Sequence, residues 1–503
     1  MTATNVPIPQ VVDWLRAHGG PVETLSQSRL LKVPAGLGAD ALTVALQAVV
    51  DHHDALRLVA RQTDGRWSLV VRDPGAVRAA DLLDRTEARG LDGPALRATV
   101  RVRSARSVAE LDPEAGALAR AVWFDAGADH PGRLLLTIHQ LAVDGASWRI
   151  LLSDLAAAWR AATEGVTPVL APVPTPLGAW PGHYRPPVAE PARTAEPPLP
   201  EGMSTVDPPL SDAPLHPARD TRATSASLVR RLPAGLSADL STVVTDTFLA
   251  DTEDVLLTAL ALAVAQWRRE QQLGADTAVL VDVPDRCRRH GAGGPDVSRT
   301  VGWLTAPRPV RIAPALSHPA GTSTGGPALA VAVRRVGEQL RNLPPHGTDQ
   351  GGPRRPARHT AVAPDRYPQP QIGFTHLGRT SVPGDGDSTA GDDGLWRPAV
   401  EQDAVTDGTG DTAPLWHTLE VTTVTEDHAD GPRLSATWTW AAQLMSEEDV
   451  RDIAEAWVAA LSDLAAHAGR SGADDPRPAP CPPDPPAVDR RVRPAVATAS
   501  LTP

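Results

Sequence analysis

The chain has 503 residues, more than one hydrophobic core usually accommodates, so the sequence predicts at least two structural units. Its 48 basic and 60 acidic residues give a formal net charge of −12, which argues against a nucleic-acid-binding protein with a concentrated basic face. There is no apolar run long enough to span a membrane, no visible signal peptide and only two cysteines, so we expect a cytoplasmic protein without membrane partners or a disulfide framework.

The first structured block is predicted at residues 6–163. Near its end, LLLTI at 134–138 is a short apolar run typical of a buried strand. The loop HQLAVDG follows at 139–145 and leads into a segment with apolar residues at helical spacing. The residues of that helical face are Trp148, Leu151, Leu152, Leu155 and Trp159. We therefore expect a strand, a short loop and an amphipathic helix in succession.

Three segments have compositions that do not favour a packed core. Residues 164–224 are rich in proline, and we expect an interlobe linker there that serves as a hinge. Residues 380–413 are rich in Gly, Asp and Thr, which favours a long surface loop. The Pro-rich tail at 468–503 is predicted to be disordered.

The second block, residues 225–467, also alternates helices and strands. Residues 255–269 predict a mostly buried helix, and the apolar run at 278–283 predicts a strand. The segments at 417–425 and 433–440 predict an antiparallel strand pair. One face of the second strand is expected to be buried through Leu434, Ala436, Trp438 and Trp440.

A final helix is predicted to begin at Ser446, with Asp449 placed for a capping box. Its buried face is expected to comprise Val450, Ile453, Trp457, Leu461 and Leu464. Because strands and helices are mixed throughout, the sequence predicts an α/β or α+β protein built from two lobes.

The loop after the first predicted strand is a common way to present reactive side chains. His139 and Gln140 leave the strand, and Asp144 with Gly145 precedes the helix. Asp144 is placed either to cap that helix or to pair with an arginine, and Gly145 permits a tight turn. Taken alone, a histidine beside a strand is more often structural than catalytic.

This loop and its helix, HQLAVDGASWRILLSDL, resemble the HHxxxDG segment of the condensation superfamily of nonribosomal peptide synthetases, and the continuation resembles the epimerization branch. Further segments resemble motifs of that family in the family's order: VPIPQ near residue 7, DHHDALRL at 51–58, VSRTVGWLTAPRPVRI at 297–312 and PQPQIGFTHLGR at 368–379. The likeness covers about residues 6–467 and is carried by five ordered motifs, which is more specific than HHxxxDG alone.

The resemblance implies two chloramphenicol-acetyltransferase-like lobes in a V, with a central tunnel between them. A phosphopantetheine arm enters such a tunnel from a peptidyl carrier protein, which would be the partner of this chain. The epimerization branch inverts the α-carbon of a carrier-bound aminoacyl or peptidyl thioester, using a base on one face and a proton donor on the other. The resemblance implies no metal and no directly bound cofactor, because the substrate is carried on the partner.

The sequence differs from the family at the motif positions that transfer protons in the reaction. Gln140 stands at the second histidine of HHxxxDG, and an amide has no useful pKa for general base catalysis. Pro284 stands at the glutamate of the EGHGRE motif, and Arg286 replaces its histidine. Asp285 is one residue away, but a shift of one residue along a strand turns a side chain to the opposite face. The catalytic candidates are therefore His139, Gln140, Asp144 and Asp285, with His139 mainly structural in the family.

Other positions correspond to motif residues that shape the fold or the tunnel. The resemblance gives structural positions to Gly145, Trp148, Arg288 and Trp303, and tunnel-lining positions to Thr375 and His376. Thr375 and His376 replace the Asn and Tyr of the segment usually written FNYLGR. We expect Arg288 to pair with Asp144 and fix the loop.

The other histidines and the cysteine near the motifs are better explained as structural or exposed residues than as catalytic ones. His52 and His53 suggest a metal site, but further ligands are not identifiable, so a structural role is favoured. His290 lies in a Gly-rich stretch and is expected to be exposed. Cys287 has arginine neighbours, which alone are weak support for a nucleophile.

Two hypotheses of different class follow. In the first, the protein is an epimerization-type enzyme of nonribosomal peptide biosynthesis with impaired or altered chemistry at the α-carbon. In the second, it is a noncatalytic carrier-protein-binding or scaffold module of an assembly line. The sequence shows neither an adenylation nor a carrier domain, so the substrate is expected to arrive on another protein, whether the chain is free-standing or the end of a synthetase.

Overall fold

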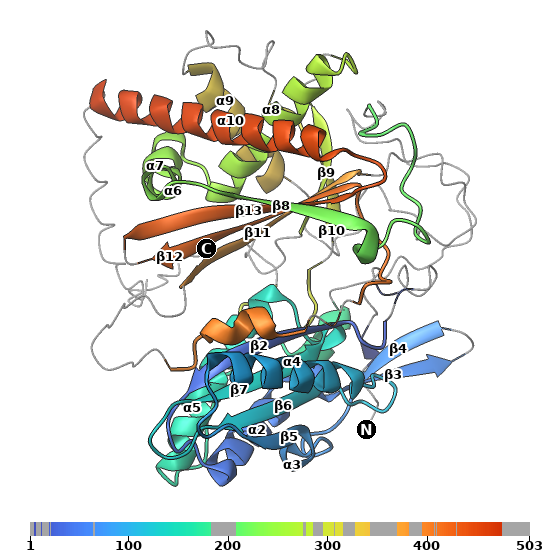
Figure 1. Ribbon diagram of the computed structural model, residues 1–503, viewed down its shortest axis with the longest axis vertical. Helices are drawn as coiled ribbons and strands as arrows, with labels where there is room; N and C mark the ends of the chain where they lie inside the picture. The colour runs from blue at the N-terminus through green and yellow to red at the C-terminus, as the bar shows by residue number, and fades with distance from the viewer. Residues whose placement is uncertain are drawn as a thin grey trace, which may run out of the picture.

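Two lobes lie one above the other in the computed structural model (Figure 1). The structure describes residues 5–6, 12, 20, 22–63, 66–182, 208–274, 278–284, 295–305, 307–314, 327–342, 370–381, 395–406, 408, 410–428 and 430–474. The N-terminal lobe contains a four-stranded and a three-stranded sheet, and the C-terminal lobe contains a six-stranded sheet. None of the described helices is long and apolar enough to cross a bilayer.

The N-terminal lobe is built around the sheet β2-β7-β6-β5, with the smaller sheet β1-β4-β3 beside it. Its strands are β1 (Asn5–Val6), β2 (Ser26–Val33), β3 (Leu58–Thr63), β4 (Arg66–Val71), β5 (Leu83–Glu87), β6 (Ala119–Asp125) and β7 (Gly132–His139). Its helices are α2 (Ala39–His52), α3 (Ala79–Leu82), α4 (Gly93–Ala109) and α5 (Gly145–Thr163), with short 3-10 turns η1 (Asp54–Arg57), η2 (Gln140–Ala142) and η3 (Leu177–Gly182). The predicted strand, loop and helix around residue 139 are confirmed as β7, η2 and α5.

The C-terminal lobe has the strand order β10-β9-β11-β12-β13-β8. Its strands are β8 (Ser225–Arg231), β9 (Val279–Pro284), β10 (Pro307–Ile312), β11 (Ile372–Ser381), β12 (Leu419–His428) and β13 (Gly431–Ala441). Its helices are α6 (Ala234–Ser241), α7 (Val243–Phe248), α8 (Thr252–Glu270), α9 (Pro327–Arg341) and α10 (Glu447–Asp474), with 3-10 turns η4 (Arg222–Thr224) and η6 (Val400–Ala404). The predicted antiparallel pair is confirmed as β12 and β13.

Helices cover one face of the six-stranded sheet, and the other face is turned toward the N-terminal lobe (Figure 1). We call the latter the interlobe face. Along β9, Val279, Val281 and Val283 belong to the core under the helices, so strand alternation places Asp282 and Pro284 on the interlobe face. Along β11, Ile372 and Phe374 belong to the same core, which places Gly373 and Thr375 on the interlobe face.

The final helix buries the predicted face. Ser446 Oγ accepts a hydrogen bond from the Asp449 backbone N–H at 3.1 Å and donates to Asp449 Oδ2 at 2.6 Å, so the N-cap hydrogen bond of the expected capping box is present. Trp457 is fully buried and meets Trp438 of β13 edge to face, with ring centroids 5.8 Å apart. The helix continues to Asp474, beyond the boundary at 467 predicted from composition.

Two segments of the second half of the chain pack on the N-terminal lobe, although the whole range 225–467 was predicted to form the C-terminal lobe. In residues 295–305, Val297, Val301 and Leu304 join the N-terminal core. In residues 395–406, the backbone N–H groups of Trp396 and Ala399 donate to carbonyls of β2, and the Lys32 N–H of β2 donates to the Arg397 carbonyl. Part of the predicted surface loop 380–413 is therefore ordered, because this edge strand has backbone groups that need partners.

Candidate functional site

The loop HQLAVDG is held in place mainly by its backbone. Strand β7 ends at His139, whose N–H donates to the carbonyl of Leu118 at 2.8 Å. The N–H of Gln140 donates to the carbonyl of Leu25 at 2.8 Å, and the turn η2 follows. The loop is thus fixed between two neighbouring chain segments before α5 begins.

The His139 ring is fully buried and both of its nitrogens are used. Nε2 donates to the Val22 carbonyl at 2.7 Å, and Nδ1 accepts from the Leu141 N–H at 3.1 Å. Burial lowers the pKa of His139 from 6.5 to about 4, against the opposing effect of the Val22 carbonyl. The neutral ring therefore acts as a support of the loop in this arrangement.

The buried His139 makes stability depend on pH. Between pH 6.5 and 4 the unfolded chain binds a proton at this residue and the folded chain does not, so stability is present above this window and is lost as the pH falls through it. We expect the free energy of unfolding to fall by about 3 kcal/mol from this residue between pH 7 and pH 4. Urea denaturation across this range would measure it. His139→Gln, which keeps a donor for Val22, should flatten the dependence, and an unchanged slope would contradict this assignment.

Asp144 caps helix α5, which confirms one of its two expected roles. Its Oδ1 accepts from the backbone N–H of Ser147 at 2.9 Å and from Ser147 Oγ at 2.7 Å. Its Oδ2 accepts from the N–H of Leu304 at 3.3 Å. Gly145 is the first residue of the helix, and a Cβ there would meet no atom within 4 Å. The expected partner Arg288 lies outside the described residues, as do Asp285, Arg286, Cys287 and His290.

The Thr-Val-Gly-Trp segment at 300–303 contacts this cap directly. The Gly302 N–H donates to Ser147 Oγ at 3.2 Å, and the Gly302 carbonyl oxygen lies 3.1 Å from the same hydroxyl, whose hydrogen is donated to Asp144. Gly302 has a φ of 152°, which a residue with a side chain rarely adopts. Trp303 is half-buried against the N-terminal core. Two motifs 155 residues apart in sequence thus form one structural unit.

The other motif positions are spread over both lobes. Trp148 is buried, and its Nε1 donates to Gln27 Oε1 at 2.8 Å, which supports a structural role. Gln140 is half-buried, and Pro284 ends β9 opposite Pro307 of β10.

Thr375 and His376 are consecutive on β11 and so point to opposite faces of the sheet. Thr375 shares the interlobe face with Gly373. His376 is half-buried, and its Nδ1 lies 3.0 Å from Thr423 Oγ1 of β12.

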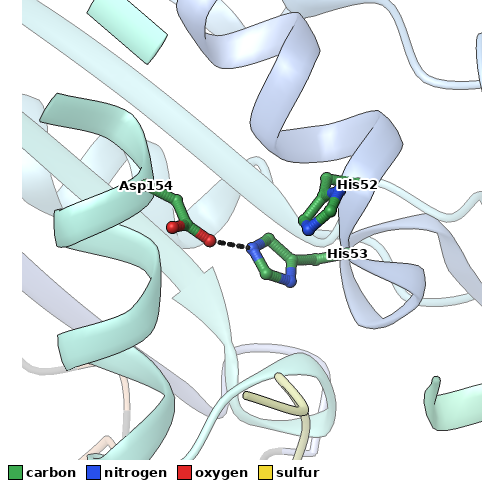
Figure 2. A group of neighbouring side chains, drawn as sticks. All are labelled: His52, His53 and Asp154. Atoms are coloured by element: carbon green, nitrogen blue, oxygen red, sulfur yellow. Dashed lines mark hydrogen bonds and ion pairs between the residues drawn. The ribbon is translucent and has the colours of Figure 1, made fainter. Parts of the chain in front are cut away.

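Figure 2 shows the group formed by His52, His53 and Asp154, whose potential ligand atoms all lie within 4.8 Å of one another. His53 Nε2 donates to Asp154 Oδ2 at 2.9 Å, and Arg299 donates to both carboxylate oxygens at 2.7 Å. Burial lowers the pKa of His53 despite the hydrogen bond to Asp154. Burial alone would raise the pKa of Asp154, but the bonds from His53 and Arg299 outweigh it and lower that pKa. A metal ion would compete with Arg299, so the geometry favours a tie between α2, α5 and residues 295–305.

A second buried histidine–aspartate pair lies in the C-terminal lobe. His417 Nε2 donates to Asp282 Oδ2 at 2.9 Å, and both side chains are buried. Neither Asp154 nor this pair was predicted from the sequence. A sequence signal for both was available, because a carboxylate within an apolar pattern indicates a buried and therefore paired charge. Asp154 lies among the buried residues of α5, and Asp282 lies within the apolar strand VLVDVP.

A cavity of about 530 Å³ adjoins the loop through Leu141 and Val22. Apolar side chains and four acidic residues, Glu23, Glu110, Asp112 and Glu114, line its wall. The cavity therefore combines apolar surface with negative charge beside Val22, whose carbonyl accepts a hydrogen bond from His139.

The family model described as a condensation domain matches residues 23–178. A linear gramicidin synthase protein of Brevibacillus parabrevis is 28% identical over 473 residues, covering 92% of this chain and 6% of that protein. The chondramide synthase of Chondromyces crocatus is 29% identical over 472 residues, covering 92% of this chain and 11% of that protein. The chain thus spans only a small part of the length of these relatives.

Solved structures share the fold at low identity. The epimerization domain from the third module of a tyrocidine synthetase superposes with a TM-score of 0.67 at 21% identity, covering 93% of this chain and 98% of that one. A condensation domain that mediates chain release from the enacyloxin polyketide synthase gives a TM-score of 0.61 at 19% identity, covering 92% and 82%. The predicted mixed α/β, chloramphenicol-acetyltransferase-like fold is confirmed. Residues 23–178 thus match the condensation-domain family, and nine-tenths of the chain is similar to parts of peptide synthetases and shares their fold.

Proposed function

We propose that this protein is an epimerization-type domain that acts on aminoacyl or peptidyl thioesters bound to a peptidyl carrier protein, with altered chemistry at the α-carbon. The observation that carries the proposal is the interlocking of the Asp144 cap with Gly302 and Leu304. This contact joins the loop HQLAVDG to the Thr-Val-Gly-Trp segment, which resembles a motif of the epimerization branch.

The surroundings of the loop are compatible with such a substrate. A thioester acidifies the α-proton, so the reaction needs proton transfer and no bound cofactor on this chain. The cavity beside Leu141 has space for an apolar side chain, and Glu23 at its wall favours a neighbouring ammonium group. The altered chemistry is proposed because Gln140 lacks a pKa in the useful range and Pro284 has no titratable group.

Gln140 and Pro284, the two residues that replace proton-transfer groups, also favour a second candidate function. Without a base at 140 and a carboxylate at 284, the chain would serve as a noncatalytic module that binds carrier proteins within an assembly line. One neighbour of this fold, the X-domain from teicoplanin biosynthesis, was solved in complex with OxyB, which is a precedent for a protein-binding role of such a fold.

Deuterium exchange at the α-carbon distinguishes the two functions. The purified protein would be mixed with an L-aminoacyl carrier protein in D₂O, and the mass and chirality of the released amino acid followed over time. We expect a mass gain above a control without the protein. Calorimetric titration with the same carrier protein would measure binding separately. Binding without mass gain would favour the noncatalytic module, and absence of binding to any loaded carrier protein would contradict both functions.

A further inference from the structure

A row of side chains crosses strands β11, β12, β13 and β8 on the interlobe face. The register sets Thr375 opposite Thr422 and Thr422 opposite Thr437. Val229 of β8 lies opposite Thr437 and ends the row. In each strand a neighbouring residue packs in the core under the helices, so strand alternation turns this row, which we call the threonine row, toward the N-terminal lobe. Its threonines are half-buried and Val229 is 43% exposed, so the row is accessible.

The threonine row begins near the motifs that resemble proton-transfer segments. Strands β9 and β11 are parallel neighbours whose register sets Thr375 level with Pro284, the last residue of β9. Residues 295–305 lead toward β10, the other neighbour of β9, and contact the Asp144 cap through Leu304. The row therefore runs from this region outward across the sheet to its edge strand β8.

The chemistry of the row suits the backbone of a peptide. Its three hydroxyl groups have no hydrogen-bond partner in the part of the chain that the structure describes. A hydroxyl both donates and accepts, so the row matches the N–H and C=O groups of an extended chain. Threonine is common in strands, but a strand that meets only water also carries charged side chains. The exposed strand β5 does so, through Asp84, Arg85 and Glu87, whereas the threonine row has none.

The length of the row exceeds that of one amino acid. Neighbouring strands lie about 4.8 Å apart, so the three steps from Thr375 to Val229 span about 14 Å, the length of about four extended residues. A single aminoacyl group held beside Pro284 would reach Thr375 at most, because one extended residue spans only about 3.4 Å. Only a longer chain contacts the hydroxyl groups of β12 and β13.

A carboxylate lies beside the row. Glu420 is two residues before Thr422 on the same face of β12, and its side chain is exposed. It has no ion-pair partner among the described residues. Its charge therefore complements an ammonium group, such as the free amino end of a short peptide lying along the row.

We propose that the threonine row binds the upstream residues of a carrier-bound peptide, so that this chain prefers a peptidyl thioester with a free amino end to a single aminoacyl thioester. This inference rests on the proposed function and names its substrate class. The thioester end of the peptide lies near Pro284, and its backbone exchanges hydrogen bonds with the hydroxyl groups of Thr422 and Thr437.

Binding measurements test the row independently of catalysis. Carrier proteins would be loaded with tetra-alanyl or with alanyl groups through an amide in place of the thioester, and titrated by calorimetry. We expect the tetra-alanyl carrier to bind about tenfold more tightly, because it gains at least two hydrogen bonds. The double variant Thr422→Val, Thr437→Val removes the hydroxyl groups and keeps the shape of the side chains. It should lose this difference while its affinity for the alanyl carrier stays unchanged.

Thr86→Val is the matched control, because Thr86 is a half-buried strand residue of β5 in the other lobe. This variant should keep the full preference for the tetra-alanyl carrier. Acetylation of the peptide's amino end should weaken binding to the unmodified protein about twofold to fivefold, and Glu420→Gln should remove that effect. An equal effect of acetylation in both proteins would place the amino end away from Glu420 and contradict the proposed orientation.

The outcomes separate this inference from the function on which it rests. Equal affinities for the two loaded carriers, or a preference retained by the double variant, would overturn the role of the row, while α-deuterium exchange by the unmodified protein would leave the enzymatic function standing. A preference for the tetra-alanyl carrier without exchange of a peptidyl thioester would support the row and contradict the enzymatic function. Should the double variant fail to fold, the Val229 methyl signals in NMR decide: a shift on adding tetra-alanyl-pantetheine but not alanyl-pantetheine supports the row, and no shift overturns it.

Discussion

Gln140→His is expected to raise the rate of α-deuterium exchange by about 10²-fold or more. The amide at 140 cannot accept a proton at neutral pH, whereas an imidazole in the same place titrates near that range. The backbone at this position is already fixed, since the Gln140 N–H donates to Leu25 and the neighbouring His139 ring is bound on both sides. The new side chain therefore enters a preorganised loop.

The measurement is mass gain of an L-aminoacyl carrier protein in D₂O, compared at equal protein and carrier concentration. Gln140→Asn is the control, because it changes the length of the side chain without adding a titratable group, and its rate should stay at the starting level. A Gln140→His protein that folds and binds the carrier but exchanges no faster would show that position 140 does not reach the substrate.

Trp457→Ala is expected to lower the free energy of unfolding by about 3–5 kcal/mol. Trp457 is fully buried between α10 and the six-stranded sheet, and its ring contacts that of Trp438 at an interplanar angle of 79°. Its Nε1 also donates to the Leu256 carbonyl of α8 at 3.2 Å. Removal of the indole leaves a cavity between α10, β13 and α8 that the surrounding helices can fill only in part.

Urea denaturation followed by far-UV circular dichroism would measure this loss. Trp457→Phe retains an aromatic ring and loses the hydrogen bond, so a smaller loss of about 1–2 kcal/mol is expected. A loss below about 1 kcal/mol for the alanine variant would mean that this part of the core relaxes freely, contrary to its packing.

Elements with a strong local period could be predicted from the sequence. Helix α5 and strands β12 and β13 carry their apolar residues at the spacing of a helix or a strand, and the structure confirms them. The cap by Asp144 was also predictable, because its chemistry is local. The fold class followed from the order of such elements and from the motifs that resemble one family.

The contacts between distant segments could not be predicted. His53 and Asp154 are 101 residues apart, and Asp282 and His417 are 135 apart, so no local pattern joins them. The pairing of residues 395–406 with β2 was missed for the same reason, since composition averaged over 380–413 hides a short ordered stretch. Asp285 and Arg288, on which the sequence-based site partly depended, lie outside the described residues and stay predictions.

The packing of residues 295–305 on the N-terminal lobe has a consequence for how this chain folds during its own translation. During translation, strands β2 to β7 and helix α5 emerge from the ribosome long before Val297, Val301 and Leu304, which complete their core. The edge of β2 waits still longer, for Trp396 and Ala399. The first lobe must therefore persist as an incomplete intermediate with apolar surface open to chaperones, and the slow closure of these long-range contacts should limit its maturation.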